Sequence, residues 1–320
     1  MLAILAHPLV FNLLVLLASL FVLYKAADLL VFGISDYAKR LGLSDAIIGL
    51  VVVAMAASAP EIISALTGFL SGETGVGYGT ILGTNMIHAA FALGLLALMC
   101  GKLTIEKSIF TRERLFLWIA LMLPFVLAVL GRELSRIDGA ILVLAFIIYL
   151  VNLWRAEGTL GKLKKNVRLQ NIWKDAFIFL GCLAALMLSG RWLVFSAVNL
   201  AYYFSIPAYF VALTVIGIAT TLPDMAVEFR AEKRKHASLG MGDLLGSLAI
   251  ELLLFFGIVA LISPIEIDLY EAGNALFFLA ASITLLIFWL KKKTLSWKHG
   301  LVFLGLYAVF LAVEIWRIAG

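Results

Sequence analysis

The sequence predicts an all-α polytopic membrane protein of about ten transmembrane helices, arranged as two inverted-topology repeats of five helices with both termini outside. Three observations lead to this prediction. Apolar residues make up 63% of the 320 positions, and charged residues only 14%. A soluble domain carries roughly 25% charged residues. The third observation is that the two halves of the chain match one another at a fixed offset.

The predicted helices follow from the length of the apolar runs. A helix that crosses the hydrocarbon core of a bilayer needs about 20 mostly apolar residues. The first run lacks a basic segment before it and is long enough to span, so we expect a retained helix and not a cleaved signal peptide. The runs, separated by short connections, lie at residues 9–32, 44–70, 76–99, 115–131, 138–154, 176–200, 206–229, 239–262, 272–290 and 299–317.

The distribution of Lys and Arg predicts the orientation. With ten spans, the loops on one side carry 20 of the 25 basic residues. The positive-inside rule makes that side cytoplasmic and places both termini outside. We therefore expect an integral protein of the plasma membrane, in a prokaryote the inner membrane. The net charge of +5 reflects this bias and does not indicate a nucleic-acid partner. The two cysteines lack metal-site spacing, and the oligomeric state cannot be read from the sequence.

An internal repeat relates the two halves at an offset of 163 residues. VVAMAASAPEIISA resembles VIGIATTLPDMAVE, so that Pro60 aligns with Pro223 and Glu61 with Asp224. At the same offset GYGTILGTNMIHAAFALG aligns with GMGDLLGSLAIELLLFFG, and the register holds without a gap over about 65 residues. Similar composition explains matched Leu and Val, but not paired Pro-acid dipeptides.

The repeat predicts the domain organisation. Residues 1–154 form a first five-helix repeat, and residues 176–320 form a second. The segments that resemble one another are 44–99 in the first repeat and 206–262 in the second. A short basic cytoplasmic loop, 155–175, joins them. Because five is odd, the second copy enters the membrane from the opposite face. Inverted repeats are typical of secondary transporters, whose site lies between the repeats near the midplane.

Buried charge and helix breaks identify the candidate site. Proline removes a backbone donor, so we expect Pro60 and Pro223 to break their helices and expose carbonyls to a polar cavity. Carboxylates at membrane depth are costly and mark ion or proton pathways. The most interior ionisable residues are Glu61, His88, Asp224 and Glu251. Three carboxylates in one cavity need protons or cations as counter-charges, and oxygen ligands suit hard cations such as Ca²⁺, Na⁺ and Mg²⁺.

Hydroxyl and other polar residues share helix faces with these acids, because positions three or four apart lie on one face. Each of the hydroxyls can alternatively serve helix packing, and His88 can alternatively bridge to a backbone carbonyl. Glu228, one turn after Asp224, is expected to face the cytoplasmic vestibule. The stripes are Ser58 with Glu61; Thr220 and Thr221 with Asp224; Thr80, Thr84 and His88; and Asp243, Ser247 and Glu251.

These segments resemble the α-repeats of the calcium/cation antiporter superfamily, in particular its sodium/calcium exchanger branch. The matching motifs are AASAPE and GTILGTNMIH in the first half, and ATTLPD and GDLLGSLAIE in the second. The resemblance implies the exchanger fold and alternating-access antiport of Ca²⁺, or another cation, against Na⁺ or H⁺, without a cofactor. It implies that the cation ligands are Glu61, Asp224, Glu251, Ser58, Thr220, Thr221, Thr84 and Ser247.

The chain departs from the family pattern at several positions. Ala57 stands where the family has a hydroxyl, and His88 replaces the central asparagine. Thr80 and Asp243 replace the asparagines of the two Gly-Asn pairs, and Asn85 is a further site-lining candidate. A histidine offers no oxygen, and its ordinary titration range suits proton handling. Proton-coupled exchange of a non-calcium cation is therefore the alternative function.

Two other classes of protein fit parts of the pattern. Gly240-Met241-Gly242-Asp243 matches the Gly-x-Gly-Asp signature of intramembrane aspartyl proteases, with Asp224 as a second acid. The same glycines align with Gly77 and Gly79 in the first repeat, which gives them a packing explanation, and we do not expect an enzyme. A channel or a scaffold without transport activity is the remaining alternative, which counter-ion-dependent, saturable flux would exclude.

Overall fold

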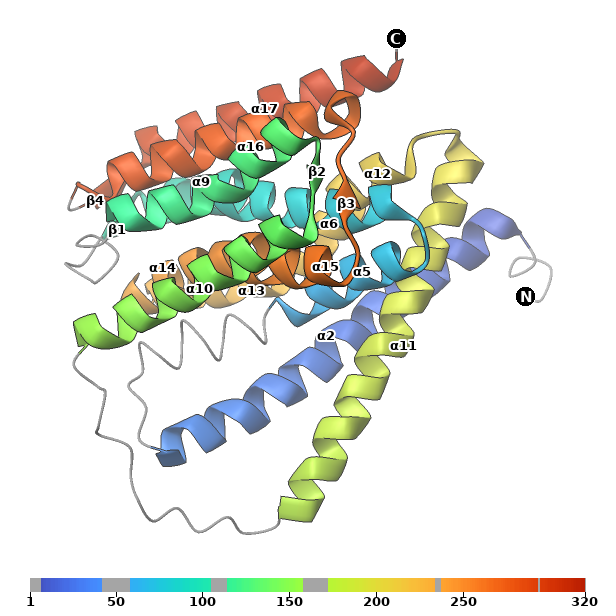
Figure 1. The fold of residues 1–320 in the computed structure, drawn as a ribbon, viewed down its shortest axis with the longest axis horizontal. Helices are drawn as coiled ribbons and strands as arrows, with labels where there is room; N and C mark the ends of the chain where they lie inside the picture. Colours follow the sequence, from blue (N-terminus) through green and yellow to red (C-terminus); the bar gives the residue numbers. More distant parts are fainter. Residues whose placement is uncertain are drawn as a thin grey trace.

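A computed structural model describes residues 7–41, 58–104, 114–157, 172–233, 237–292 and 294–319 as a helical bundle with four very short strands (Figure 1). Its α-helices are α2 (Pro8–Leu41), α5 (Ala59–Leu70), α6 (Thr74–Met86), α7 (Leu93–Cys100), α9 (Arg114–Gly131), α10 (Arg136–Glu157), α11 (Ile172–Phe204), α12 (Ala208–Val211), α13 (Gly217–Lys233), α14 (Ala237–Ala249), α15 (Phe256–Ile262), α16 (Leu269–Trp289) and α17 (Trp297–Ala319).

Six helical stretches of the described chain are long and apolar enough to cross a membrane. They are Pro8–Ala26, Thr74–Cys100, Arg114–Gly131, Asp243–Ile262, Leu269–Trp289 and Trp297–Ile318. Helices α10 and α11 cover the predicted spans 138–154 and 176–200. Large apolar side chains such as Leu130, Ile137 and Phe277 are exposed on the outside of the bundle. An apolar exterior of this extent is that of a bundle surrounded by lipid.

Figure 1 shows three parts of the bundle. Helices α2 and α11 cross and pack against one another on one side. On the other side α16 packs against both α9 and α17. Between these parts lie α5, α6, α13 and α14, which carry the polar stripes, together with α7 and α15, which continue the chain after α6 and α14.

Three helices contain π-helical turns. They are η2 (Ile87–Ala92) between α6 and α7, η3 (Ala212–Ile216) between α12 and α13, and η4 (Ile250–Phe255) between α14 and α15. The bounds of η2 and η4 differ by 163 at both ends, as do those of α6 and α14. The repeat offset found in the sequence is therefore also an offset between helix irregularities. Turns of π-helix are rare in proteins, and those that occur often lie at functional sites.

The short strands pair in a pattern that exchanges the two halves. β1 (Lys102–Thr104) pairs with β4 (Thr294–Ser296), and β2 (Glu133–Leu134) pairs with β3 (Ile265–Glu266), both antiparallel. Each pair joins one strand from either half. Since β1 precedes α9 and β2 follows it, the two small sheets lie at opposite ends of an 18-residue helix, about 27 Å long.

Two glycine crossings show the same exchange. In one, Gly94 on α7 meets Gly300 on α17, and a Cβ added to Gly94 would lie 3.0 Å from the Gly300 carbonyl oxygen. In the other, Gly257 on α15 meets Gly139 on α10, again with 3.0 Å between the added Cβ and the partner's carbonyl oxygen. Gly94 and Gly257 are 163 residues apart. Helix packing within membranes favours such small residues because the backbones approach closely.

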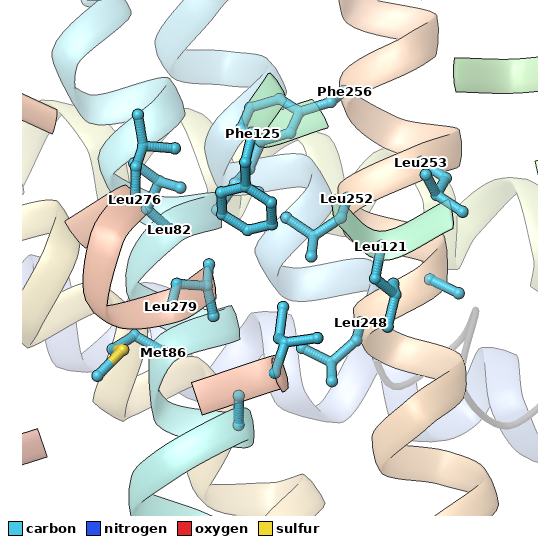
Figure 2. Packing of buried hydrophobic residues seen from close by; sticks show 14 of the residues in the cluster. Leu82, Met86, Leu121, Phe125, Leu248, Leu252, Leu253, Phe256, Leu276 and Leu279 are labelled. Atoms are coloured by element: carbon cyan, nitrogen blue, oxygen red, sulfur yellow. The ribbon is translucent and has the colours of Figure 1, made fainter. Parts of the chain in front are cut away.

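The apolar core lies where α6, α9, α14, α16 and the π-helical turns meet. Figure 2 shows Leu82 and Met86 of α6 close to Leu276 and Leu279 of α16, with Phe125 of α9 nearby. Interlocking side chains of this kind hold the surrounding helices at native packing density. The site helices thus have a rigid apolar backing.

The structure corrects the prediction for Pro223. Helix α13 is continuous from Gly217 to Lys233 and does not break at that residue. The irregularity in this span lies earlier, in η3. One turn before the proline, the hydroxyls of Thr220 and Thr221 donate to the carbonyls of Ile216 (2.9 Å) and Gly217 (2.8 Å). Hydroxyl side chains and π-type adjustments allow a membrane helix to continue through a proline. In the first half, Pro60 does lie at the start of helix α5.

A polar cluster away from the candidate site joins the C-terminal helices to α6. Arg317 of α17 pairs with Glu314 at 2.6 Å and donates to the backbone carbonyl of Glu271 on α16 at 2.5 Å. Asn274 donates to the other Glu314 oxygen at 2.9 Å. The hydroxyl of Tyr78 on α6 hydrogen-bonds the Glu271 carboxylate. Glu314 is fully buried, so these contacts satisfy a carboxylate that otherwise costs several kcal/mol.

Candidate cation site

The first stripe of the site lies at the start of α5. Ser58 caps this helix, and Glu61 is the acid of its first turn. Both side chains are buried, and neither the hydroxyl nor either carboxylate oxygen has a hydrogen-bond partner within the described residues. The adjacent Ala57 lies outside the described residues. Ser58 and Glu61 are thus both buried, three residues apart at the start of α5.

The matching stripe lies on α13. Thr220, Thr221 and Asp224 are buried there, at 3%, 0% and 4% exposure. Asp224 lies within electrostatic range of Glu61, and Glu61 of Glu251. The three predicted acids therefore gather in one region although they are distant in sequence, as the repeat predicted.

The third and fourth stripes run along two long helices. Thr80, Thr84 and His88 lie on α6 and its extension η2; Asp243, Ser247 and Glu251 lie on α14 and its extension η4. All six side chains are buried. His88 and Glu251 each occupy the second position of a π-helical turn, η2 and η4, where the backbone departs from α-helical spacing.

Donors from the first half hold the carboxylate of Glu251. The Thr84 hydroxyl and the Asn85 side-chain amide donate to its Oε2 at 2.7 and 2.8 Å. Asn85 also donates to the Ile81 carbonyl at 2.7 Å, which fixes its orientation. The other oxygen of Glu251, Oε1, has no partner in the described part of the chain. One oxygen is therefore oriented by α6 while the second is free to bind a cation.

His88 has turned toward α13. Its Nε2 lies 3.6 Å from Asp224 Oδ2 and its Nδ1 lies 3.6 Å from Glu228 Oε1. These separations are ion-pair contacts longer than good hydrogen bonds. The ring is 1% exposed, so its neighbourhood consists of protein groups. His88 therefore lies beside two buried acids of α13.

Glu228 is a site residue that the sequence interpretation placed elsewhere. We expected it in an open vestibule, but its exposure is 2% and its carboxylate faces the His88 ring. The signal was present in the helical spacing, because Glu228 lies four residues after Asp224 on the same face of α13. The assignment to the vestibule was wrong. The spacing of four residues, which puts Glu228 on the face of Asp224, predicts its position correctly.

Several hydroxyls are oriented so that their oxygens can accept a cation. Thr80, Thr220 and Thr221 donate their protons to carbonyls one turn earlier in their own helices, at 2.8 to 2.9 Å. A hydroxyl oxygen that donates its proton retains its lone pairs as acceptors. Ser247 is buried and has no hydrogen-bond partner in the part of the chain that is described. The hydroxyl set therefore provides hard oxygen ligands.

The acids do not form a compact metal cluster. Within the described ranges, no three His, Cys, Asp or Glu side chains lie close enough to hold one ion together. Both buried carboxylate oxygens of Asp243 lack a hydrogen-bond partner among the described residues, and Asp243 lies within electrostatic range of Glu228. Binding a cation here requires hydroxyl, amide and carbonyl oxygens beside the carboxylates, a ligand set suited to Na⁺ or Ca²⁺.

Comparison with known proteins finds relatives that match nearly the whole chain. The family model "Sodium/calcium exchanger protein" matches residues 11–155 and 174–316. The chain is 30% identical over 316 residues to the inner membrane protein YrbG of Escherichia coli, covering 94% of this chain and 96% of that protein. It is 27% identical to the sodium/calcium exchanger MaX1 of Methanosarcina acetivorans, with coverage of 94% and 98%.

Solved structures share the fold. The H⁺/Ca²⁺ exchanger CAX superposes with a TM-score of 0.74 at 16% identity, covering 96% of this chain and 87% of that one. The sodium-calcium exchanger NCX_Mj superposes with a TM-score of 0.67 at 22% identity, covering 95% and 98%.

The apolar exterior and these matches identify an integral membrane protein of the cation-exchanger class. The chain belongs to the sodium/calcium exchanger protein family, a member of the calcium/cation antiporter superfamily. Because members of this family are exchangers, the Gly-x-Gly-Asp protease interpretation is excluded.

Proposed function

We propose that this chain is a secondary active antiporter that exchanges Ca²⁺, or another small cation, for Na⁺ or H⁺ by alternating access. The observation that carries the proposal is the Glu251 carboxylate. Thr84 and Asn85 of one repeat orient one of its oxygens, and the other stays unpartnered beside Glu61 of α5. A buried acid held between two repeats can bind a cation that must leave when the repeats move.

The proposed ligands are the acids Glu61, Asp224 and Glu251 and the hydroxyls of Ser58, Thr84, Thr220, Thr221 and Ser247. Several carboxylates in one water-poor region repel one another strongly unless cations or protons neutralise them. A protein whose site is empty and fully charged therefore switches poorly between its inward-open and outward-open states. That penalty couples the movement of one cation to the return of another. The lipid bilayer and small inorganic cations are the partners in this scheme, and no cofactor takes part.

We further propose ten spans in two inverted repeats, 1–154 and 176–320, joined by the basic loop 155–175. The cross-paired strands and the two glycine crossings support this arrangement, because the offset of 163 residues relates one strand pair to the other and one crossing to the other. The sheet β1–β4 lies beside lysines, and the sheet β2–β3 contains Glu133 and Glu266. By the positive-inside rule the first sheet is cytoplasmic, and α17 then ends outside, in the plasma membrane.

The contact between His88 and two acids favours one alternative, proton-coupled exchange of a cation other than Ca²⁺. An imidazole between Asp224 and Glu228 brings a nitrogen where an oxygen ligand is expected. Histidine is the side chain whose ordinary charge change falls nearest neutral pH. Both functions use the same site and differ in the coupling ion.

Counterflow in liposomes tests the proposal. Purified protein is reconstituted, and Ca²⁺ uptake is measured with an outward Na⁺ gradient, an outward H⁺ gradient, or neither. We expect saturable uptake with one gradient and none without a gradient. The Glu61→Gln variant is the site control and Glu266→Gln, on the exposed strand β3, is the surface control. Absence of Ca²⁺ flux under both gradients sinks the calcium assignment, and flux without a counter-ion indicates a channel.

A further inference from the structure

Glu228 has no counterpart in the first repeat. The position 163 residues earlier is Ala65, which is fully buried in the apolar core. The second repeat has therefore placed an additional carboxylate in the transport region. Both of its oxygens are buried without a hydrogen-bond partner in the described residues. A buried acid of this kind destabilises the fold unless a nearby group compensates it.

His88 is the group that faces Glu228. Equivalent positions in the repeat are His88 and Glu251, yet their surroundings differ. Glu251 reaches across to Thr84, whereas the His88 ring lies between Asp224 and Glu228, 3.6 Å from each. Asp224 and Glu228 are four residues apart on α13, so one helical turn separates the two acids. The ring spans this turn.

This placement obstructs Asp224 as a cation ligand. Asp224 Oδ2 is the oxygen that faces the ring, and within the described residues it has no hydrogen-bond partner. An imidazole offers no oxygen to a hard cation. A cation that binds Asp224 Oδ2 must therefore displace His88 from it. The energetic cost of that displacement depends on which other partner the ring has.

We propose that Glu228 is a positioning residue that receives the His88 ring when a cation binds Asp224, so that the ring moves between the two acids during exchange. This inference rests on the proposed function. With Glu228 present, the ring keeps one carboxylate partner after it leaves Asp224. With Glu228 removed, Asp224 is the one carboxylate of the described residues left within 4 Å of the ring, and the cation competes with the full contact.

Cation affinity tests this role. In the Glu228→Gln variant we expect the half-saturating concentration of the transported cation to rise about tenfold, equivalent to about 1.4 kcal/mol. Glu228→Asp retains the carboxylate on a shorter side chain and should give an intermediate value. Glu266→Gln, at the exposed position of β3, is the control and should match the wild type. Gel filtration and thermal unfolding show whether each variant is folded.

The decisive comparison is made in the His88→Asn background. If Glu228 acts through the ring, adding Glu228→Gln to His88→Asn changes the half-saturating concentration less than twofold. Non-additivity of this kind is the signature of two residues acting together. A tenfold effect in both backgrounds shows that Glu228 acts on the cation directly, or through the fold, and overturns the proposal. The absence of any effect in the wild-type background overturns it as well.

A measurement without transport separates this inference from the proposed function. ¹⁵N-histidine NMR of the protein in detergent follows the ring while CaCl₂ or NaCl is added, and His88→Asn identifies its signal. We expect the His88 signal to move with cation in the wild type, and to need about tenfold more cation in Glu228→Gln. If vesicles show no exchange but the signal responds in this way, the antiport proposal fails while the ring movement stands. A stationary signal in a protein that exchanges cations refutes the movement.

Discussion

Gly83 is the position where the two repeats approach most closely beside the site, and Gly83→Ala tests whether that approach matters. A Cβ built on Gly83 of α6 would lie 2.3 Å from the carbonyl oxygen of Leu213 and 2.8 Å from its carbonyl carbon, both in η3. Ordinary contacts between non-bonded atoms begin near 3.5 Å. The two backbones must therefore separate by about 1 Å, because the carbonyl oxygen and carbon of Leu213 belong to the backbone and not to a flexible side chain.

The expected cost follows from this separation. Overpacking of a tight interface costs typically about 1–3 kcal/mol, and for a chain of this size about 2–4 °C of melting temperature accompanies each kcal/mol. Thr84 and Asn85 directly follow Gly83, and their bonds to Glu251 are 2.7 and 2.8 Å long. A shift of about 1 Å breaks them. Misplacement of that size costs on the order of 100-fold in rate where geometry governs function.

The assay combines thermal unfolding in detergent with counterflow in liposomes. Gly83→Ala should lower the melting temperature by several degrees and the cation flux by at least tenfold. The matched control is Gly305→Ala in helix α17, where an added Cβ meets no atom within 4 Å and where alanine favours the helix by up to about 1 kcal/mol. Wild-type stability and flux in Gly83→Ala refute the contact that the structure places there.

Three further variants test separate features. Glu61→Gln should abolish exchange without lowering the melting temperature, because an unpartnered buried carboxylate contributes no stability; a large loss of stability contradicts the unpartnered geometry. Asn85→Leu should cost about 1–3 kcal/mol, measured by thermal unfolding, since Glu251 loses a buried donor; it should also slow uptake at least tenfold, whereas an unchanged uptake argues against orientation by Asn85. Arg317→Gln should cost about 3–5 kcal/mol because Glu314 loses its buried charge partner. The exposed Arg136→Gln is the matched control, and equal melting temperatures of the two variants contradict that reasoning.

The acids and hydroxyls of the site could be predicted from the sequence because burying them in a membrane requires a function. Charged residues inside apolar runs are rare and costly, so Glu61 and Asp224 stand out without any structure. The offset of 163 residues pairs the stripes in the sequence, and the structure places η2 and η4 at that same offset. These conclusions needed only composition and self-similarity.

The orientation of side chains could not be predicted in the same way. The sequence interpretation placed Glu228 in the cytoplasmic vestibule and a helix break at Pro223; the structure buries the first and keeps α13 continuous through the second. The spacing of four residues between Asp224 and Glu228 puts them on one face of α13, but it does not say whether that face meets protein or an open cavity. The neighbouring helices fix it, and they come from distant parts of the chain.

The sequence by itself determined that the chain is a membrane protein, that its halves repeat, and that Glu61, Asp224 and Glu251 lie inside apolar runs. Only the tertiary structure decided which groups meet. It placed Thr84 and Asn85 against Glu251, more than 160 residues away. It also placed His88 against Asp224 and Glu228 of α13. The physical reason is that burial energies depend on residue type, which the sequence states directly. Pairing energies depend on distances of a few ångströms, which only packing between the repeats establishes.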